Sequence, residues 1–297
     1  MHILDQISAD VSSMPSYNIL FLIAAMLPAV VLCIYVYRKD RVEKEPVWLL
    51  MLMLALGALC VFPAIFFESF AEVFENDLAA RIGEIQSDGT VLMNTFNYYG
   101  YQFIHYFLVV AFVEEGLKWL VIFLFIRKNK NFNSLFDGII YSVFVSLGFA
   151  VLENIMYVFQ YGLGNAVLRA VTAVPAHTFF GVFMGYFFSL YKIRNVKAFY
   201  EKSWGKTEKS LRTGGKAKYY LVLSFFVPVF LHGLYDFSTE FTIFSVAFIG
   251  VLGFLYIISF RKIRRISKED KSIEYIAGQE MLKENPDVSA AISSQRK

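Results

Sequence analysis

The chain has 297 residues, of which 57% are hydrophobic, and its mean hydropathy is +0.51. This composition, with several apolar runs of about 18 residues or more, excludes an ordinary soluble core and is typical of a polytopic α-helical membrane protein. The formal net charge of +3 is unremarkable. Cys33 and Cys60 both lie inside apolar runs, so we interpret them as buried thiols rather than as disulfide partners or zinc ligands.

Seven apolar runs are long enough to cross a bilayer as helices. They are Asn18–Tyr37, Val47–Phe67, Tyr101–Ile126, Leu135–Gln160, Ala166–Leu190, Tyr219–Phe237 and Phe241–Phe260. The predicted fold class is therefore all-α, a transmembrane helix bundle of about seven spans. Its expected organisation is an N-terminus (1–17), two first spans (18–67), an outer loop (68–100), a five-helix core (101–260) and a charged tail (261–297).

The basic residues predict how the bundle is oriented. Clusters of Lys and Arg follow the first, third, fifth and seventh spans, whereas the opposite loops carry few. Because positively charged loops stay in the cytoplasm, the N-terminus is predicted outside and the C-terminus inside. In the outer loop, apolar residues from Phe70 to Ile85 recur at helical spacing and predict an amphipathic helix, followed by a turn at Asp88-Gly89.

The most unusual stretch is Glu114-Glu115-Gly-Leu-Lys118, inside the third span. A charged side chain at the centre of a bilayer costs roughly 2.5–3.5 kcal/mol. Three such residues within about one turn therefore require an explanation. One is a Glu–Lys pair that locks helix packing, and the other is a catalytic or transport centre.

Three further spans carry polar residues, namely Glu153-Asn154 in the fourth, Pro175-Ala-His177 in the fifth and His232-Gly-Leu-Tyr-Asp236 in the sixth. Pro175 is expected to kink its helix. At about 1.5 Å per residue, the ionisable groups fall within about 6–8 Å of one level, in the middle-to-outer half of the membrane. This shared level favours one joint site over several independent structural roles. In contrast, Ser134-Leu-Phe-Asp137 predicts a helix N-cap at the inner end of the fourth span.

Several protease chemistries lack their motifs here. No span contains a Gly-x-Ser-x-Gly setting, and His-Glu-x-x-His is absent. Tyr235-Asp236 matches half of the aspartyl-protease pattern, but the partner segment Gly162-Leu-Gly-Asn165 has no acid.

A family resemblance rests on four segments, Val113-Glu-Glu-Gly-Leu-Lys118, Leu152-Glu-Asn154, Pro175-Ala-His177 and Leu231-His-Gly-Leu-Tyr-Asp236. Together, and in this order, they resemble the PrsW-type intramembrane proteases, which are related to the CAAX-prenyl endopeptidase and bacteriocin-processing superfamily. The resemblance covers about Tyr101 to Thr239.

The resemblance implies a multi-pass peptidase of the bacterial cytoplasmic membrane that cleaves single-span or otherwise membrane-anchored proteins. The namesake cleaves an anti-sigma factor at site one in a stress response. No nucleic-acid partner is expected.

The resemblance also implies roles for individual residues. Its double-Glu motif falls on Glu114 and Glu115, and its histidines fall on His177 and His232. We expect Glu114 to act as general base, His177 to help hold the water and His232 to stabilise the oxyanion. The expected catalytic residues also include Glu115 and Glu153, which support or orient the water. The expected supporting residues are Lys118, Asn154 and Asp236.

Asp236 stands where the superfamily often has Asn, so it either is protonated or orients His232. The mechanism in which Glu114 acts as general base on water needs no cofactor. Family members have also been described as metalloproteases, and in that alternative Glu114, Glu153, His177 and His232 bind Zn²⁺. Two other classes stay open: a proton- or ion-coupled transporter, which also places such groups at the midplane, and a seven-span receptor or scaffold.

Overall fold

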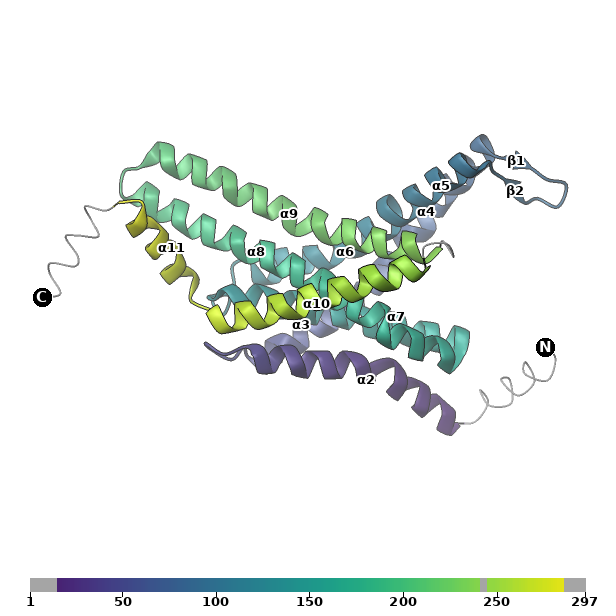
Figure 1. Cartoon of the computed structure of the whole chain (residues 1–297), viewed down its shortest axis with the longest axis horizontal. Coiled ribbons are helices and arrows are strands. Elements are labelled where there is room, and N and C mark those ends of the chain that lie inside the picture. Colours follow the sequence, from purple (N-terminus) through teal and green to yellow (C-terminus); the bar gives the residue numbers. More distant parts are fainter. Residues whose placement is uncertain (1–14, 241–244, 286–297) are drawn as a thin grey trace, which may run out of the picture.

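The computed structural model describes residues 15–240 and 245–285 (Figure 1). Most of the predicted N-terminus, the start of the seventh predicted span and the end of the charged tail lie outside these residues. The described chain is α-helical apart from one small hairpin, which confirms the all-α class. Its helices are α2 (Pro15–Lys39), α3 (Val47–Leu59), α4 (Val61–Ile82), α5 (Thr95–Phe103), α6 (Ala111–Val121), α7 (Leu135–Val171), α8 (Ala173–Ser203), α9 (Thr207–Glu240), α10 (Ser245–Glu269) and α11 (Ile273–Lys283).

Four described helical stretches are long and apolar enough to cross a membrane, namely Ile19–Lys39, Val47–Ile82, Leu135–Ser203 and Thr207–Thr239. The third of these contains two helices, α7 and α8. The predicted span Tyr101–Ile126 is built from α5 and α6 with two π-helical segments, η1 (Ile104–Val110) and η2 (Ile122–Ile126). The count of seven spans and the orientation of the termini stay predictions.

Helix α7 forms the centre of the bundle. Every residue from Phe136 to Ala150 is buried, because α8 packs on one side of it and α2 and α3 pack on the other. The hairpin of β1 (Glu84–Ile85) and β2 (Val91–Leu92) and the helix α11 lie at opposite ends of the molecule (Figure 1). The turn predicted at Asp88-Gly89 connects the two strands, and Gly89 has a φ of +83°.

The segment before α8 differs from the sequence-based expectation. The fifth helix begins at Ala173 rather than Ala166, because residues 166–171 still belong to α7. Within α7 the chain turns sharply at Gly162, whose φ of +79° suits a residue without a Cβ. Pro175 therefore lies in the first turn of α8, where its missing N–H breaks no helical hydrogen bond, and the predicted kink is wrong.

The amphipathic helix predicted from Phe70 to Ile85 is the continuation of α4, which begins at Val61 and ends at Ile82, and Ile85 lies in β1 instead. Phe70, Val73 and Phe74 are largely exposed on α4.

At the other end of the bundle, the predicted N-cap is confirmed. Ser134 and Asp137 form a capping box at the start of α7. Asp270, between α10 and α11, accepts a hydrogen bond from the Phe136 amide at 3.0 Å and so ties the C-terminal helices to α7.

Two glycines allow α3 and α7 to approach closely. A Cβ added to Gly148 would lie 1.9 Å from the carbonyl oxygen of Leu54, and one added to Gly57 would lie 2.0 Å from that of Val145. Both neighbours are backbone atoms, which cannot move aside as a flexible side chain can. The contact between these helices therefore depends on glycine at both positions.

We expect Gly148→Ala to destabilise the protein, because its Cβ must push α3 and α7 apart and overpacking typically costs about 1–3 kcal/mol. Thermal unfolding of the purified protein in detergent measures this as a lower Tm. Gly250→Ala on α10 is the matched control, since nothing lies within 4 Å of its added Cβ. It should leave the Tm unchanged or raise it slightly. Equal Tm values for both variants would contradict the close contact.

Candidate active site

Lys118 lies at the centre of the polar cluster and is completely buried. Its Nζ donates to Glu114 Oε2 at 3.0 Å and to Glu115 Oε1 at 2.8 Å, and it lies 3.3 Å from His177 Nδ1. An ammonium group has three N–H donors and no acceptor, so these three contacts use all of them. The ring of Phe149 also covers the ammonium, with 3.8 Å between Nζ and the ring centroid. The buried charge is therefore fully compensated.

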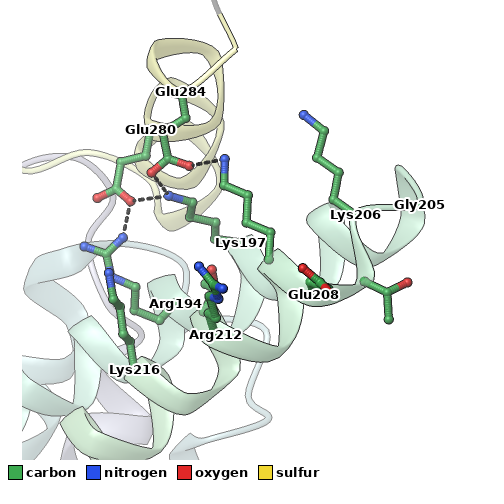
Figure 2. Close-up of a pocket in the computed structure, with 12 residues that line it drawn as sticks. Arg194, Lys197, Gly205, Lys206, Glu208, Arg212, Lys216, Glu280 and Glu284 are labelled. Atoms are coloured by element: carbon green, nitrogen blue, oxygen red, sulfur yellow. Dashed lines mark hydrogen bonds and ion pairs between the residues drawn. The ribbon is translucent and has the colours of Figure 1, made fainter.

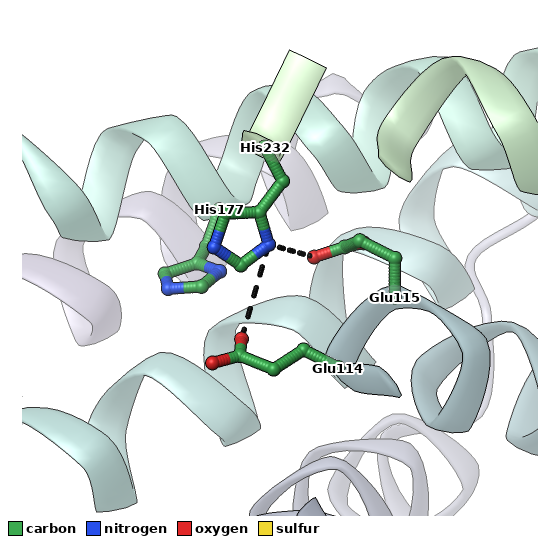
Figure 3. A group of neighbouring side chains, drawn as sticks. All are labelled: Glu114, Glu115, His177 and His232. Carbon is green, nitrogen blue, oxygen red and sulfur yellow. Dashed lines mark hydrogen bonds and ion pairs between the residues drawn. The ribbon is translucent and has the colours of Figure 1, made fainter. Parts of the chain in front are cut away.

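His232 joins α9 to this cluster. Its Nδ1 lies 3.0 Å from Glu115 Oε1 and 3.9 Å from Glu114 Oε2 (Figure 3). Its Nε2 lies 3.1 Å from Asp236 Oδ2. The ring of Phe180 stacks on the imidazole, with centroids 4.8 Å apart and planes at 17°. The orientation of the imidazole is thus fixed by carboxylates at both nitrogens and by an aromatic ring on one face.

His177 is held in a similar way by α7. Its Nε2 lies 3.0 Å from Glu153 Oε2. When Nε2 carries the proton, Nδ1 is free to accept a hydrogen bond from Lys118. Glu153 in turn pairs with Arg169, whose Nη2 lies 2.8 Å from Oε1. Arg169 also donates from Nε to Asn154 Oδ1 at 2.9 Å, so Asn154 positions the arginine.

The site borders a cavity of about 760 Å³. Five of its lining residues belong to the predicted site, namely Glu114, Glu153, His177, His232 and Asp236. The opposite wall comes from α4 and η1 and includes Glu68, Glu72, Glu75 and His105. His105 Nδ1 lies 3.1 Å from Glu75, so this histidine belongs to the cavity wall and not to the cluster around Lys118. Glu114 faces the cavity, whereas Glu115 is completely buried behind it.

Four of these residues form a donor set suited to a metal ion. One ligand atom from each of Glu114, Glu115, His177 and His232 lies within 4.8 Å of all the others. Mixed imidazole and carboxylate donors suit Zn²⁺. Glu115 Oε2 is a buried carboxylate oxygen without a hydrogen-bond partner among the described residues. The residues therefore fit a divalent metal, with Glu115 in the position that the sequence analysis gave to Glu153.

Comparison with known proteins identifies the family. The profile of the PrsW family intramembrane metalloproteases matches residues 45–261. The chain belongs to the PrsW family. The match is broader than the stretch from Tyr101 to Thr239 that carries the resemblance in sequence. Family membership favours the peptidase over the transporter and the receptor or scaffold.

Individual relatives are similar over most of their length. Protease PrsW of Geobacillus kaustophilus is 34% identical over 72% of this chain and 76% of its own. The protein of the same name from Oceanobacillus iheyensis is 33% identical over 82% of this chain and 95% of its own. Protease PrsW of Bacillus subtilis is 32% identical over 72% of this chain and 80% of its own. No solved structure matches the chain significantly.

The structure of this PrsW-family chain brings all eight predicted site residues into one connected network. The residue that the sequence analysis missed is Arg169, which neutralises Glu153. A signal for it exists, because Arg169 is the only Lys or Arg between Lys130 and Lys192. A single basic residue in an apolar region this long indicates a buried acidic partner.

We expect Arg169→Met to lower the free energy of unfolding by about 2–4 kcal/mol, because it leaves the buried Glu153 carboxylate without its counter-ion. In the double variant with Arg169→Met and Glu153→Gln, the loss of unfolding free energy should be smaller than the sum of the losses in the two single variants. Chemical unfolding in detergent of the two single variants and the double variant measures this coupling. Arg81→Met is the control, because its pair with Asp77 is exposed to solvent and its loss should leave the free energy of unfolding nearly unchanged. Additive effects of Arg169→Met and Glu153→Gln would contradict the ion pair.

Proposed function

We propose that this chain hydrolyses peptide bonds of membrane-anchored proteins with a water molecule that Glu114 activates. The observation that carries the proposal is that Glu114 is the member of the glutamate pair that lines the cavity. Glu115 is committed to Lys118 and His232 behind the cavity wall. A general base must reach both water and substrate, and only Glu114 of the pair meets that condition.

The proposed hydrolysis begins with removal of a proton from water by Glu114. The water oxygen then bonds to the carbonyl carbon. The resulting oxyanion is stabilised by the positive charge of the His232 imidazolium, whose two N–H groups face Glu115 and Asp236. When the peptide bond breaks, the proton held by Glu114 passes to the leaving nitrogen. His177 helps to hold the water, since Glu153 fixes its ring through Nε2.

Asp236 has an orienting role in this proposal. It lies 3.1 Å from His232 Nε2, which supports the alternative in which it positions the histidine. An ionised carboxylate has no hydrogen to donate to an oxyanion, whereas it holds an imidazole well. The presence of Asp where the superfamily often has Asn is then compatible with activity.

A metal-dependent version of the same activity is the second candidate. It is favoured by the family description and by the four-residue donor set. Glu114, Glu115, His177 and His232 would hold the ion. A bound Zn²⁺ would lower the pKa of a bound water to near 7 and polarise the substrate carbonyl.

The substrate and the location are inferred from the family resemblance and the apolar helices. We propose a single-span or otherwise membrane-anchored substrate, cleaved in the manner of an anti-sigma factor at site one. The protein would lie in the cytoplasmic membrane of a bacterium, with about seven spans and its C-terminus inside. The relation to the CAAX-prenyl endopeptidase superfamily is part of this proposal.

We expect Glu114→Gln to reduce cleavage of a tagged single-span substrate by about 1000-fold, because loss of the base removes proton transfer in addition to the position of the water. Its Tm should change little, since a neutral amide still accepts from Lys118. Glu115→Gln should lower the Tm more, because it weakens the contacts with both Lys118 and His232. Glu84→Gln, an exposed change on the hairpin, is the control. Equal cleavage by the wild type and Glu114→Gln would disprove the role of Glu114.

The two versions differ in their response to chelation. If Glu114 activates the water without a metal ion, the rate of cleavage after exhaustive treatment with phenanthroline should equal the rate of the untreated enzyme. Elemental analysis of the purified protein provides the control that metal removal is complete. Loss of activity that returns on addition of Zn²⁺ would replace the first version by the metal-dependent one.

A further inference from the structure

A second cavity lies far from the active site, where the ends of α8, α9 and α11 meet. Its volume is about 850 Å³. Arg194, the lining residue of α8 nearest to His177, is 17 residues away from it along the helix, or about 26 Å. This end of the molecule carries the basic loop that the sequence predicts to be cytoplasmic. The cavity is thus separate from the proteolytic site.

The walls of the cavity carry an excess of positive charge. Six cationic side chains line it, namely Arg194, Lys197, Lys206, Lys209, Arg212 and Lys216. Three acids face them, namely Glu208, Glu280 and Glu284 (Figure 2). The formal excess of three positive charges in one concave site attracts anions.

Helix α11 neutralises part of this charge. Lys197, which is 97% buried, lies 3.2 Å from Glu280 Oε2 and 2.6 Å from Glu284 Oε1. Glu280 also pairs with Arg194 (Figure 2), and Glu284 pairs with Lys209 at 2.7 Å. Two carboxylates from α11 therefore occupy the positions that the oxygens of an anionic ligand would take.

Of the remaining cations, Lys206 donates a hydrogen bond to Asn285 Oδ1, whereas Arg212 and Lys216 have no such partner among the described residues. Within residues 15–240 and 245–285, Arg212 and Lys216 make no ion pair or side-chain hydrogen bond, and both are exposed toward the solvent. They lie four residues apart on α9 and so on the same face of the helix. The N-terminal turn of α9, with Thr207 and Glu208, also borders the cavity and adds the positive end of a helix dipole.

We propose that this cavity binds a phosphate-bearing anion. Arginine and lysine together suit phosphate oxygens, the first by its planar pair of donors and the second as a compact charge. The volume is in the range of pockets for small organic ligands and exceeds what an inorganic ion requires. Arg212 and Lys216 make the first contacts, and the ligand competes with Glu280 and Glu284 for Lys197 and Arg194.

Two sources supply this chemistry, namely a soluble phosphorylated compound and the headgroup of an anionic lipid. Arg194 and Lys216 lie at the end of the cavity nearest to the predicted spans, where a headgroup can reach them. Lys206 and Lys209 lie at the end farthest from those spans, about 15–20 Å along α9 from Tyr219. The experiment therefore tests both sources.

The test uses the full chain purified in detergent and titrated with inorganic pyrophosphate at constant ionic strength in a calorimeter. Saturable binding is expected, and Arg212→Ala with Lys216→Ala should weaken it at least tenfold. The matched control is Lys202→Ala with Lys218→Ala, two exposed lysines of α8 and α9 that do not line the cavity; it should bind within twofold of the wild type. Glu280→Gln with Glu284→Gln should tighten binding severalfold, because it frees the shared cations.

The second arm uses vesicles of phosphatidylcholine with or without phosphatidylglycerol, and measures which lipid the purified protein retains. Retention of phosphatidylglycerol by the wild type but not by the Arg212/Lys216 variant, without pyrophosphate binding, assigns the site to a headgroup. If neither probe binds, or if the Arg212/Lys216 variant and its control bind alike, the proposal is wrong. Thermal unfolding of each variant shows that it is folded. The changes at Arg212, Lys216, Lys202 and Lys218 should leave the Tm unaltered, whereas Glu280→Gln with Glu284→Gln should lower it, because the buried Lys197 loses its carboxylate partners.

Discussion

The buried ammonium of Lys118 is the interaction on which the arrangement of the site depends. A charged group without solvent is tolerated only when each of its hydrogens finds an acceptor. Lys118 finds two of its acceptors on its own helix and the third, His177, on α8. Because Glu115 also contacts His232 of α9, a single charge network fixes three helices relative to one another. Removal of Lys118 would leave the Glu114 and Glu115 carboxylates without their shared counter-ion, and an unpaired buried charge typically costs about 3–5 kcal/mol.

The network distributes its charges unevenly among the carboxylates. Glu153 has Arg169, and Asp236 has His232. Glu115 contacts both Lys118 and His232. Glu114 shares Lys118 with Glu115, and its Oε2 lies 3.9 Å from His232 Nδ1. Of the two adjacent glutamates, Glu114 is the one that lines the cavity, which is the position that a general base requires.

The sequence predicted the site better than the boundaries of the helices around it. The cost of burying charge makes Glu114, Glu153, His177 and His232 conspicuous in an apolar background, and a common depth is enough to group them. Hydropathy contains no comparable information on where a helix ends. Residues 166–171 are as apolar as a span, so the turn at Gly162 and the start of α8 at Ala173 were not predictable from composition. Arg169 was missed for the same reason, because it lies after the turn at Gly162 and its contact with Glu153, before the turn, depends on that turn.

Hydrolysis between apolar helices requires that water reach the reacting bond, and the cavity explains how. Its wall on α4 carries Glu68, Glu72 and Glu75, and its wall on α7 to α9 carries Glu153, His177 and Asp236. Polar groups on both sides give a water molecule the several partners that it needs to stay in such a space. The rigid side is α7, which is buried over its first half and pressed against α3 through Gly57 and Gly148. The side formed by α4 is largely exposed. The candidate site residues therefore lie on the more rigid wall, and the cavity separates the charges around Lys118 from the more exposed α4.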